Sequence, residues 1–496
     1  MNSSERYLRG GALSRRDLLR RATAFMGASV VHVGSNGSTL GSSARASTTP
    51  AGVPRHVEFG GCFGQEIIYE GWWAGQANPS FDSLRTLSRH GMEWAKVSVT
   101  TLGDPALDAP VGQWRSFGWQ NRFWSSQQMM AALLQKARDV GMRLQVQFYL
   151  SDTAANAGVQ ARPAAWSQLS DAGLAAQVET YARESAHHFK TRGLEIELFE
   201  LGNECDFGLC GYSLPTPPQG IVWQENPQWM YDALWSKYVP LYNAAIRGVR
   251  SVYPNTAFAL HISGFGYSSK NVLAKAFFDL MRDAGVDFQV ASLSYPYIHA
   301  GMPRVPQPYF AQTEFLSALD HIRLSGKRVH VTEFGYPAAP EGNDAAGAPY
   351  PFTADGQAEF LSTYAQALRG RVERVNYWSP DVFSGVNGPG GLPPAVESSG
   401  LFASASVARP AVYRISRVAA DRCFDWAEKK FPEIFPQAAA SATGLGYYYR
   451  HYPATGTYVG IREGTDAIVL HNDREWKFAE VGRLSEFLRI AASEGY

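Results

Sequence analysis

The amino-acid sequence predicts an α/β protein, a (β/α)8 TIM barrel followed by a small C-terminal α+β module. Short β-rich runs alternate with amphipathic helical patterns, the longest connecting segments follow strands, and the composition changes near residue 420. Alternation of this kind indicates parallel strands joined by crossover helices. A chain of 496 residues suits one barrel and one further module.

The predicted strands are short runs rich in apolar and β-branched residues. They are residues 56–62, 93–99, 143–150, 195–201, 256–262, 288–294, 328–332 and 374–378. Between them, apolar residues recur at helical spacing, which predicts amphipathic helices. The predicted helices are residues 127–140, 174–191, 230–252, 273–284, 313–324 and 354–368.

A doubly wound sheet also alternates strands with helices. However, no G-x-G-x-x-G sequence follows the first predicted strand and no G-x-x-x-x-G-K-[ST] sequence occurs, so the usual nucleotide-site argument for that fold is missing. The long segments favour the barrel, because loops after barrel strands share the C-terminal face that holds active sites. These segments are residues 102–124, 152–166, 202–226, 337–351 and 380–401.

The N-terminal residues 1–46 are predicted to be a twin-arginine-type signal peptide. Ser14-Arg15-Arg16-Asp17-Leu18-Leu19 resembles that export signature, and Ala44-Arg45-Ala46 supplies a small-x-small cleavage site after an apolar stretch. The stretch is too short, and too rich in Gly and Ser, to span a membrane. We therefore expect an exported protein, periplasmic or secreted, with a barrel domain at residues 47–420 and a module at residues 421–496. A disordered basic tail is the alternative interpretation.

The charge balance excludes one class of partner. Lys+Arg and Asp+Glu both total 45, so the formal net charge is zero, whereas a nucleic-acid binder usually has a basic surplus. No later segment approaches ~18 consecutive apolar residues, so no membrane span is expected. The 13 Trp and 24 Tyr fit either a large core or flat surfaces for stacking sugar rings. Oligomeric state cannot be read from these patterns.

Two glutamates end predicted strands. Glu204 follows Gly202-Asn203 after the fourth strand, and Glu333 ends the seventh. These strand ends lie across the barrel mouth from each other, so both carboxylates can face one sugar, as a retaining glycosidase requires at about 5–5.5 Å separation. Asn203 is placed to hydrogen-bond the sugar 2-hydroxyl. The alternative is that each Glu caps a helix or pairs with Lys or Arg.

The four cysteines, at positions 62, 205, 210 and 423, match no zinc or redox motif. In an oxidising compartment, Cys205 and Cys210 could close a small loop beside Glu204. Buried thiols are an equally open interpretation.

Further blocks between about residues 58 and 400 form an ordered set. They are Phe148-Tyr149-Leu150-Ser151-Asp152 with Pro163-Ala164-Ala165-Trp166, Gly202-Asn203-Glu204, His261, Ser294-Tyr295-Pro296-Tyr297 with His299, Glu333-Phe334-Gly335-Tyr336-Pro337, residues 351–360, and Tyr377-Trp378. Their order and spacing resemble glycoside hydrolase family 53, the endo-β-1,4-galactanases. Each block alone is weakly specific, and the signal lies in the ordered set.

The resemblance implies a (β/α)8 retaining enzyme with Glu204 as general acid/base and Glu333 as nucleophile. It also implies endo-acting hydrolysis of β-1,4-galactan or arabinogalactan by double displacement, without a metal or other cofactor. Asn343 and Asp344 are thin support for the calcium ion that some members hold. Other matched residues are expected to bind the substrate or hold the catalytic groups. They are Asn203, Asp152, His261, Tyr295, Tyr297, His299 and Trp378.

The chain departs from the family pattern around the sugar pocket. Tyr149 and Leu150 stand in place of the family's His and Tyr, and Lys96 and Ser98 in place of its Arg-x-Arg on strand two. Lys96 can replace the charge of an arginine but not its planar fork. Two alternatives stay open: a related enzyme that cleaves another β-glycan (mannan, glucan or exopolysaccharide), and a non-catalytic polysaccharide-binding protein. Polysaccharide is the expected partner in each case.

Overall fold

The structure is a computed structural model. It describes residues 56–63, 83–101, 126–152, 155, 160–263, 272–295, 313–340, 348–381, 398–404, 407–436, 439–473 and 479–496. The chain divides into two compact units. Of the described residues, the barrel unit comprises those within 56–88 and 92–415, and the C-terminal unit comprises those within 89–91 and 416–496.

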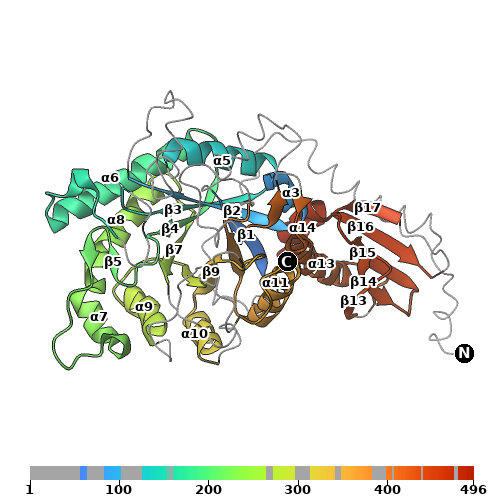
Figure 1. The fold of residues 1–496 in the computed structure, drawn as a ribbon. Coiled ribbons are helices and arrows are strands. Elements are labelled where there is room, and N and C mark those ends of the chain that lie inside the picture. The colour runs from blue at the N-terminus through green and yellow to red at the C-terminus, as the bar shows by residue number, and fades with distance from the viewer. Residues whose placement is uncertain are drawn as a thin grey trace, which may run out of the picture. The chain divides into compact units, whose positions relative to one another are not determined.

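The barrel unit is a closed barrel of eight parallel strands, which confirms the predicted TIM barrel (Figure 1). Around the barrel the order is β1-β10-β9-β8-β7-β4-β3-β2. All eight predicted strands are present, and their ends differ from the prediction by at most two residues, because strand ends carry weak sequence signals. The barrel strands are β1 (Glu58–Cys62), β2 (Met92–Val99), β3 (Arg143–Phe148), β4 (Ile196–Leu201), β7 (Ala257–Ile262), β8 (Val290–Tyr295), β9 (Arg328–Phe334) and β10 (Arg374–Trp378).

Helices follow the strands as the apolar spacing predicts (Figure 1). Several begin with a polar N-cap: Ser126 accepts from the Met129 amide, and Thr353 from the Gly356 amide, so each satisfies a free donor of the first turn. The helices of the barrel unit are α3 (Ser83–Arg89), α5 (Gln127–Asp139), α6 (Asp171–Lys190), α7 (Pro227–Ala233), α8 (Tyr238–Arg250), α9 (Val272–Asp283), α10 (Thr313–Leu324) and α11 (Ala354–Leu368).

The prediction of one continuous helix over residues 230–252 is wrong. The structure has α7 and α8 there, separated by a 3-10 turn at Trp235–Lys237. Pro240 in the first turn of α8 has no N–H to continue a helix from α7. The Trp235 indole donates instead to the Asp206 carbonyl and packs edge-on against Phe277, which fixes the break.

The segment after β4, expected to be a loop, contains a short hairpin of β5 (Gly208–Leu209) and β6 (Tyr212–Ser213). Its backbone is fixed to the barrel at two places. The Gly202 amide donates to the Phe148 carbonyl over 2.8 Å, and the Cys205 amide donates to the His261 carbonyl over 2.9 Å. Residue 204 is thereby held between strands β3 and β7.

The barrel strands bury polar side chains as well as apolar ones. Many occur two residues apart on one strand, so they share a face, and bonds between non-adjacent strands place that face inside the barrel. The buried polar residues are Lys96, Gln145, Gln147, Glu200, His261, Ser292, Ser294, His330, Thr332, Arg374 and Asn376. Branched apolar residues usually fill such an interior, so this lumen requires a complete hydrogen-bond network.

The far end of this network is a buried guanidinium. Arg374 lies 3.7 Å over the Trp94 ring and donates to Gln145 Oε1 over 2.8 Å. Burial lowers the pKa of Arg374 to about 9, and the carboxylate of Glu58 opposes that shift. Gln145 is thereby oriented with its amide nitrogen free to donate towards the C-terminal end of the barrel.

The C-terminal unit is an α+β module, as predicted. A five-stranded antiparallel sheet is ordered β13-β14-β15-β16-β17. The strands are Ser441–Gly444, Tyr447–Tyr452, Thr457–Arg462, Ala467–Asn472 and Ala479–Arg483. The apolar face of the sheet shares a core with residues of α13 (Pro410–Lys430) and α14 (Leu484–Ser493).

The tyrosine-rich strand β14 divides its side chains between the two faces of this sheet. Tyr448 and Tyr452 lie on the helix-covered face, where they donate to Asp421 and Glu428. Arg450, on the same face, pairs with Asp421 and Asp425 as well as Glu428. This part of the tyrosine cluster therefore belongs to the core.

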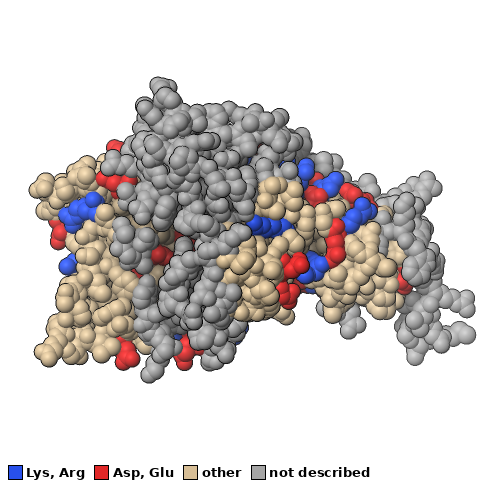
Figure 2. Space-filling model, viewed as in Figure 1, with Lys and Arg blue, Asp and Glu red and all other residues tan. Residues whose placement is uncertain are grey.

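All four cysteines are free thiols. In the described part of the chain, no helix combines the length and the apolar character needed to cross a membrane. On the face shown in Figure 2, the described Lys and Arg side chains lie interspersed with Asp and Glu. This mixture agrees with a net charge of zero.

A glycine in α8 sets the approach of two helices. A Cβ at Gly248 would lie 2.3 Å from the Glu179 carbonyl oxygen and 3.0 Å from the Arg183 amide of α6. We predict that Gly248→Ala lowers the free energy of unfolding by about 1–3 kcal/mol, because backbone atoms cannot rotate away. Gly173→Ala in α6 is the matched control, since its nearest atom is a serine hydroxyl at 3.3 Å. Denaturant unfolding that shows equal effects for both would contradict this packing.

Candidate active site

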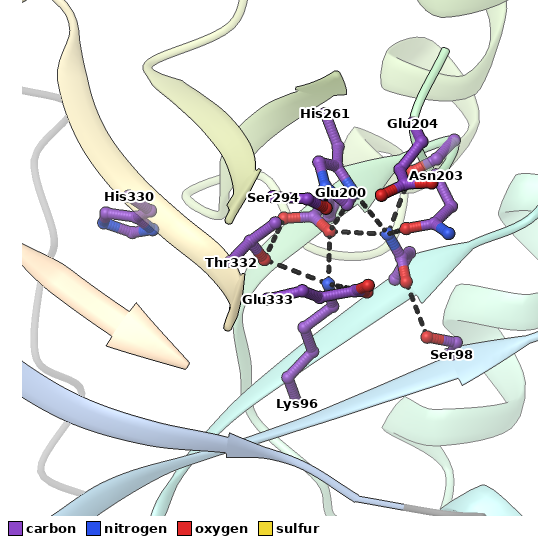
Figure 3. A network of polar contacts seen from close by, with 12 residues as sticks. Lys96, Ser98, Glu200, Asn203, Glu204, His261, Ser294, His330, Thr332 and Glu333 are labelled. Carbon is purple, nitrogen blue, oxygen red and sulfur yellow. Dashed lines mark hydrogen bonds and ion pairs between the residues drawn. The ribbon is translucent and has the colours of Figure 1, made fainter. Parts of the chain in front are cut away.

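The candidate site lies at the C-terminal ends of the barrel strands (Figure 3). Glu333 is the penultimate residue of β9, and Glu204 lies three residues after the end of β4. In the view of Figure 3 their side chains lie on opposite sides of the hydrogen-bonded cluster around Glu200 and Asn203. Both carboxylates are half-buried. The closed barrel thus brings together two residues that are far apart in sequence.

Glu204 has a left-handed backbone, with φ of 49°. Such a conformation is unfavourable for a residue with a side chain, and it persists only where the surroundings impose it. Here the flanking amides of Gly202 and Cys205 are bonded to β3 and β7, and Gln160 donates to the Asn203 carbonyl over 2.6 Å. This backbone conformation therefore sets the direction in which the Glu204 side chain leaves the loop.

Lys96 is the cation beside Glu333. Its side chain is fully buried, and its three ammonium protons have three acceptors. Nζ lies 2.6 Å from Glu200 Oε1, 2.9 Å from Thr332 Oγ1 and 3.1 Å from Glu333 Oε1. Burial alone would lower the pKa of Lys96, but Glu200 and Glu333 raise it well above its ordinary value. Lys96 is therefore a permanent ammonium at the base of the site.

Glu200 is the fully buried counterion of Lys96. Besides the ammonium, its two oxygens accept from Gln147 Nε2 over 2.6 Å, Thr332 Oγ1 over 2.8 Å and Gln145 Nε2 over 3.1 Å. Burial alone would raise the pKa of Glu200, but Lys96 and His261 hold it well below its usual range. The carboxylate is therefore ionised and has no surface exposed for substrate.

Gln147 connects Glu200 to the loop that carries Glu204. Its amide nitrogen lies within hydrogen-bond distance of Glu200 Oε1, the Gly202 carbonyl and Asn203 Oδ1, at 2.6, 3.1 and 2.9 Å. Its oxygen accepts from Ser98 over 2.6 Å, which fixes the orientation of the amide. One buried anion is thus linked both to the Glu333 side and to the Glu204 side of the site.

His261 lies beneath the mouth of the barrel and is fully buried. Its Nδ1 is 3.3 Å from Glu200 Oε1, and its Nε2 is 2.8 Å from Ser294 Oγ. Both ring nitrogens therefore have partners within the protein. These partners do not include Glu204 or Glu333, and the predicted roles of His261 towards the substrate and the catalytic groups stay predictions.

Asn203 and Asp152 order the surrounding loops. The Asn203 amide donates to the Ala155 carbonyl over 2.7 Å while its oxygen accepts from Gln147. Asp152 accepts from the Thr101 hydroxyl over 2.7 Å and from the Ala164 amide over 2.8 Å. These bonds tie together the segments that follow β2, β3 and β4, and the proposed sugar contacts of both residues remain predictions.

The structure places the other predicted residues less completely. Trp378 ends β10 and is half-buried, as the floor of a sugar subsite requires. Tyr295 is the last residue of β8, and only its backbone is described. Tyr297 and His299 lie outside the described residues, as do Asn343 and Asp344. Within the described ranges, no three His, Cys, Asp or Glu side chains are grouped closely enough to hold a metal ion.

Two neutral side chains lie near Glu333. Burial raises the pKa of Cys62 and of Tyr149 far above their ordinary values, and the negative charge of Glu333 adds to both shifts. The Cys62 thiol donates to the Thr332 carbonyl over 3.0 Å. Tyr149, one of the departures from the family pattern, therefore places an uncharged phenol in this part of the pocket.

Sequence reasoning missed Glu200, Gln145, Gln147 and Thr332. One signal was available: the runs Gln145-Val146-Gln147 and Lys96-Val97-Ser98 place polar residues two apart within strands. In a buried parallel strand both faces are usually apolar, so this alternation marks a polar face. The partners of each residue become visible only when the barrel closes.

Comparison with known proteins agrees with this geometry. The sequence model of glycosyl hydrolase family 53 matches residues 72–419, well over half of the chain. The chain belongs to glycosyl hydrolase family 53. It is therefore a glycoside hydrolase, and its differences from its relatives are those of a divergent member of the family.

Its curated relatives are distant. The chain is 25% identical to the endo-β-1,4-galactanase of Bacillus subtilis over 253 residues, 48% of this chain and 52% of that protein. It is 27% identical to a probable arabinogalactan endo-β-1,4-galactanase A of Aspergillus terreus over 270 residues, 50% of this chain and 68% of that protein. The matches thus span about half to two thirds of these relatives.

Solved structures of the family share the fold. A catalytic domain of this family from Ignisphaera aggregans matches with a TM-score of 0.56 at 20% identity, covering 74% of this chain and 98% of that one. A fungal β-1,4-galactanase matches with a TM-score of 0.53 at 17% identity, covering 73% and 99%. At this level of identity the likeness establishes the barrel alone.

The Lys96 environment makes stability depend on pH. The pKa of Glu200 is depressed in the folded protein, so its pairing stabilises the fold above the unfolded-state value near about 4.3 and is lost as pH falls. Lys96→Met leaves Glu200 buried without its cation, so burial raises the pKa of Glu200 in the folded variant above its unfolded value. The contribution of Glu200 to stability then increases as pH falls. We predict a loss of about 3–5 kcal/mol at pH 7 that becomes smaller towards pH 5.

Thermal unfolding between pH 5 and pH 8 measures this effect. Lys96→Arg keeps the positive charge and is the control, so any loss that it shows should stay nearly constant with pH. A Lys96→Met deficit that is equally constant would contradict the ion pair.

Proposed function

We propose that this member of family 53 is an exported retaining endo-β-glycanase, with Glu204 as general acid/base and Glu333 as nucleophile. The observation that supports this most is the setting of Glu333. Its carboxylate lies at the end of a barrel strand, 3.1 Å from a buried ammonium, while a second carboxylate, Glu204, lies in the loop just after β4. A cation orients a carboxylate nucleophile and favours its ionised form.

In the first step, a Glu333 oxygen attacks the anomeric carbon as the bond to the leaving oxygen breaks. The leaving oxygen takes the bond's electron pair and receives the proton of Glu204. The products are a glycosyl ester on Glu333 and an anionic Glu204. In the proposed mechanism, Trp378 supports the sugar ring during this step and Asn203 binds its 2-hydroxyl.

In the second step, Glu204 acts as a base. It takes a proton from water while the water oxygen attacks the anomeric carbon, and the ester bond to Glu333 breaks. Two inversions give net retention, and both carboxyl groups return to their starting states. Lys96 and Glu200 keep their charges throughout, because neither exchanges a proton with the substrate.

β-1,4-Galactan or arabinogalactan is the first candidate substrate, because the curated relatives carry those names. The departures at Lys96, Ser98, Tyr149 and Leu150 favour testing other β-glycans beside it. Tyr149 is buried close to Glu333, so the altered positions belong to the part of the pocket that would hold the cleaved sugar.

We further propose export through the twin-arginine pathway, with cleavage after Ala46. The support is the Ser14-Arg15-Arg16 signature and the small-x-small site in the sequence. Residues 1–46 lie outside the described part of the structure. Fractionation of cells that express the full chain, beside an Arg15→Lys/Arg16→Lys variant, would test export through retention of the variant in the cytoplasm.

The catalytic assignment is tested by hydrolysis of a panel of β-linked polysaccharides that includes β-1,4-galactan. We predict that Glu204→Gln lowers kcat/KM by about 10²–10⁴-fold and that Glu333→Gln lowers it at least as much. Glu197→Gln, near the N-terminal end of β4, is the matched control and should retain activity. NMR of the first products should show the β anomer, as retention requires.

Cleavage of another glycan with both variants inactive would keep the mechanism and assign the altered pocket to that substrate. Binding of a glycan without any cleavage would favour a polysaccharide-binding protein. Initial release of the α anomer would overturn the nucleophile assignment.

A further inference from the structure

The charges around Lys96 are unequal before the reaction. One ammonium faces two carboxylates, Glu200 at 2.6 Å and Glu333 at 3.1 Å. Of these, Glu333 is 18% exposed, whereas the side chains of Lys96 and Glu200 are completely buried. The two carboxylates together carry one more negative charge than the single ammonium between them.

The first chemical step consumes one of these negative charges. When Glu333 becomes a glycosyl ester, its oxygens no longer carry a charge, but Lys96 keeps its proton. A buried cation without a counterion costs several kcal/mol. A site that held Lys96 with Glu333 alone would therefore destabilise its own covalent intermediate.

We propose that Glu200 is a positioning residue that serves as the lasting counterion of Lys96 while Glu333 is esterified. The inference rests on the proposed retaining mechanism. In the free enzyme Glu200 shares the ammonium, so Lys96 neutralises Glu333 only in part and leaves it reactive. In the intermediate, the Lys96–Glu200 pair is neutral and complete.

Glu200 is the group that can fill this role among the described neighbours of Lys96. Cys62 of β1 and the phenol of Tyr149 after β3 are neutral, because burial raises the pKa of each. His261 of β7 touches Glu200 and is no anion. Glu204 must cycle between acid and base, so it cannot supply a constant charge.

The remaining contacts of Glu200 keep it ionised through both steps. Donors from three strands surround it: Gln145 and Gln147 of β3, Thr332 of β9, and Lys96 of β2. None of these donors contacts substrate in the proposed mechanism. The oxygen of the Gln145 amide accepts from Arg374, so Glu200 is also linked to a second cation through Gln145.

A stability cycle tests the charge relation without any substrate. Glu333→Gln removes the charge of Glu333 as esterification does, and it leaves Lys96 paired with Glu200. Glu200→Gln leaves Lys96 paired with Glu333. The double variant leaves Lys96 without a counterion, so we predict that its Tm falls by about 5 °C or more beyond the sum of the single losses.

The matched control replaces Glu197 on the same strand. Glu197 pairs with Arg143, with Nη2 to Oε2 at 2.7 Å, and in the described part of the chain no hydrogen bond or ion pair joins it to Lys96. Glu197→Gln combined with Glu333→Gln should therefore give additive losses. Additive losses in the Glu200/Glu333 cycle as well would overturn the proposal.

The double variant also has a signature in pH that loss of packing lacks. Without either carboxylate, burial lowers the pKa of Lys96 in the folded state below its unfolded value. The unfolded state then binds more protons, so stability rises with pH. We predict that the Tm deficit of the double variant shrinks between pH 7 and pH 9.5, and a constant deficit would count against an unpaired ammonium.

Kinetics on whichever glycan the unmodified chain cleaves provide a second test. Glu200→Gln removes a negative charge that lies close to the reacting groups, so the acidic limb of kcat/KM should move to lower pH. Its kcat/KM should fall by about tenfold or more, because Lys96 then neutralises the nucleophile and opposes esterification. A uniform loss without movement of the limb would indicate a structural role alone.

The proposed function and the counterion role of Glu200 are tested by different experiments, so one can be overturned without the other. Absence of hydrolysis on every glycan would overturn the proposed function, whereas the stability cycle decides whether Glu200 is the counterion that Lys96 retains when Glu333 is neutral.

Discussion

The ion pair between Lys96 and Glu200 lies inside the barrel, where neither side chain reaches solvent. Removing both charges from water is costly, and their attraction offsets this cost only if every remaining hydrogen-bonding atom finds a partner. Strands β3 and β9 supply those partners, through Gln145 and Gln147 of β3 and Thr332 of β9. The positions of these side chains in the site therefore depend on one requirement, the solvation of a buried pair by neighbouring strands.

Much of the fold could be predicted from the sequence, because the spacing of apolar residues records which face of each segment is buried. The same spacing could not reveal the break between α7 and α8, which depends on Trp235 reaching Asp206. Glu204 and Glu333 were recognisable because each ends a strand. Lys96 was visible only as a departure, since its partner Glu333 is 237 residues away and meets it only in the closed barrel.

This chain has Lys96 where the family pattern has an arginine. The difference changes the kind of contact with the carboxylates as well as its strength. A guanidinium presents a planar fork to a carboxylate, whereas an ammonium directs three protons to separate acceptors. Here those acceptors come from two strands, β4 and β9, so Lys96 joins the two sides of the barrel mouth. Gln147 extends the connection to Asn203, and thus to the strained backbone that carries Glu204.

The buried pair also limits which substitutions this sequence can accept during evolution. Replacing either Lys96 or Glu200 alone leaves an unsolvated charge in the lumen, so a single neutral substitution at one position is strongly disfavoured while the other remains. Changes at the two positions should therefore be inherited together, through simultaneous or rapidly compensated exchange. Among close homologues, these residues of strands β2 and β4 should covary more tightly than residues that merely touch, and the pair would mark the lineage in which this form of the site arose.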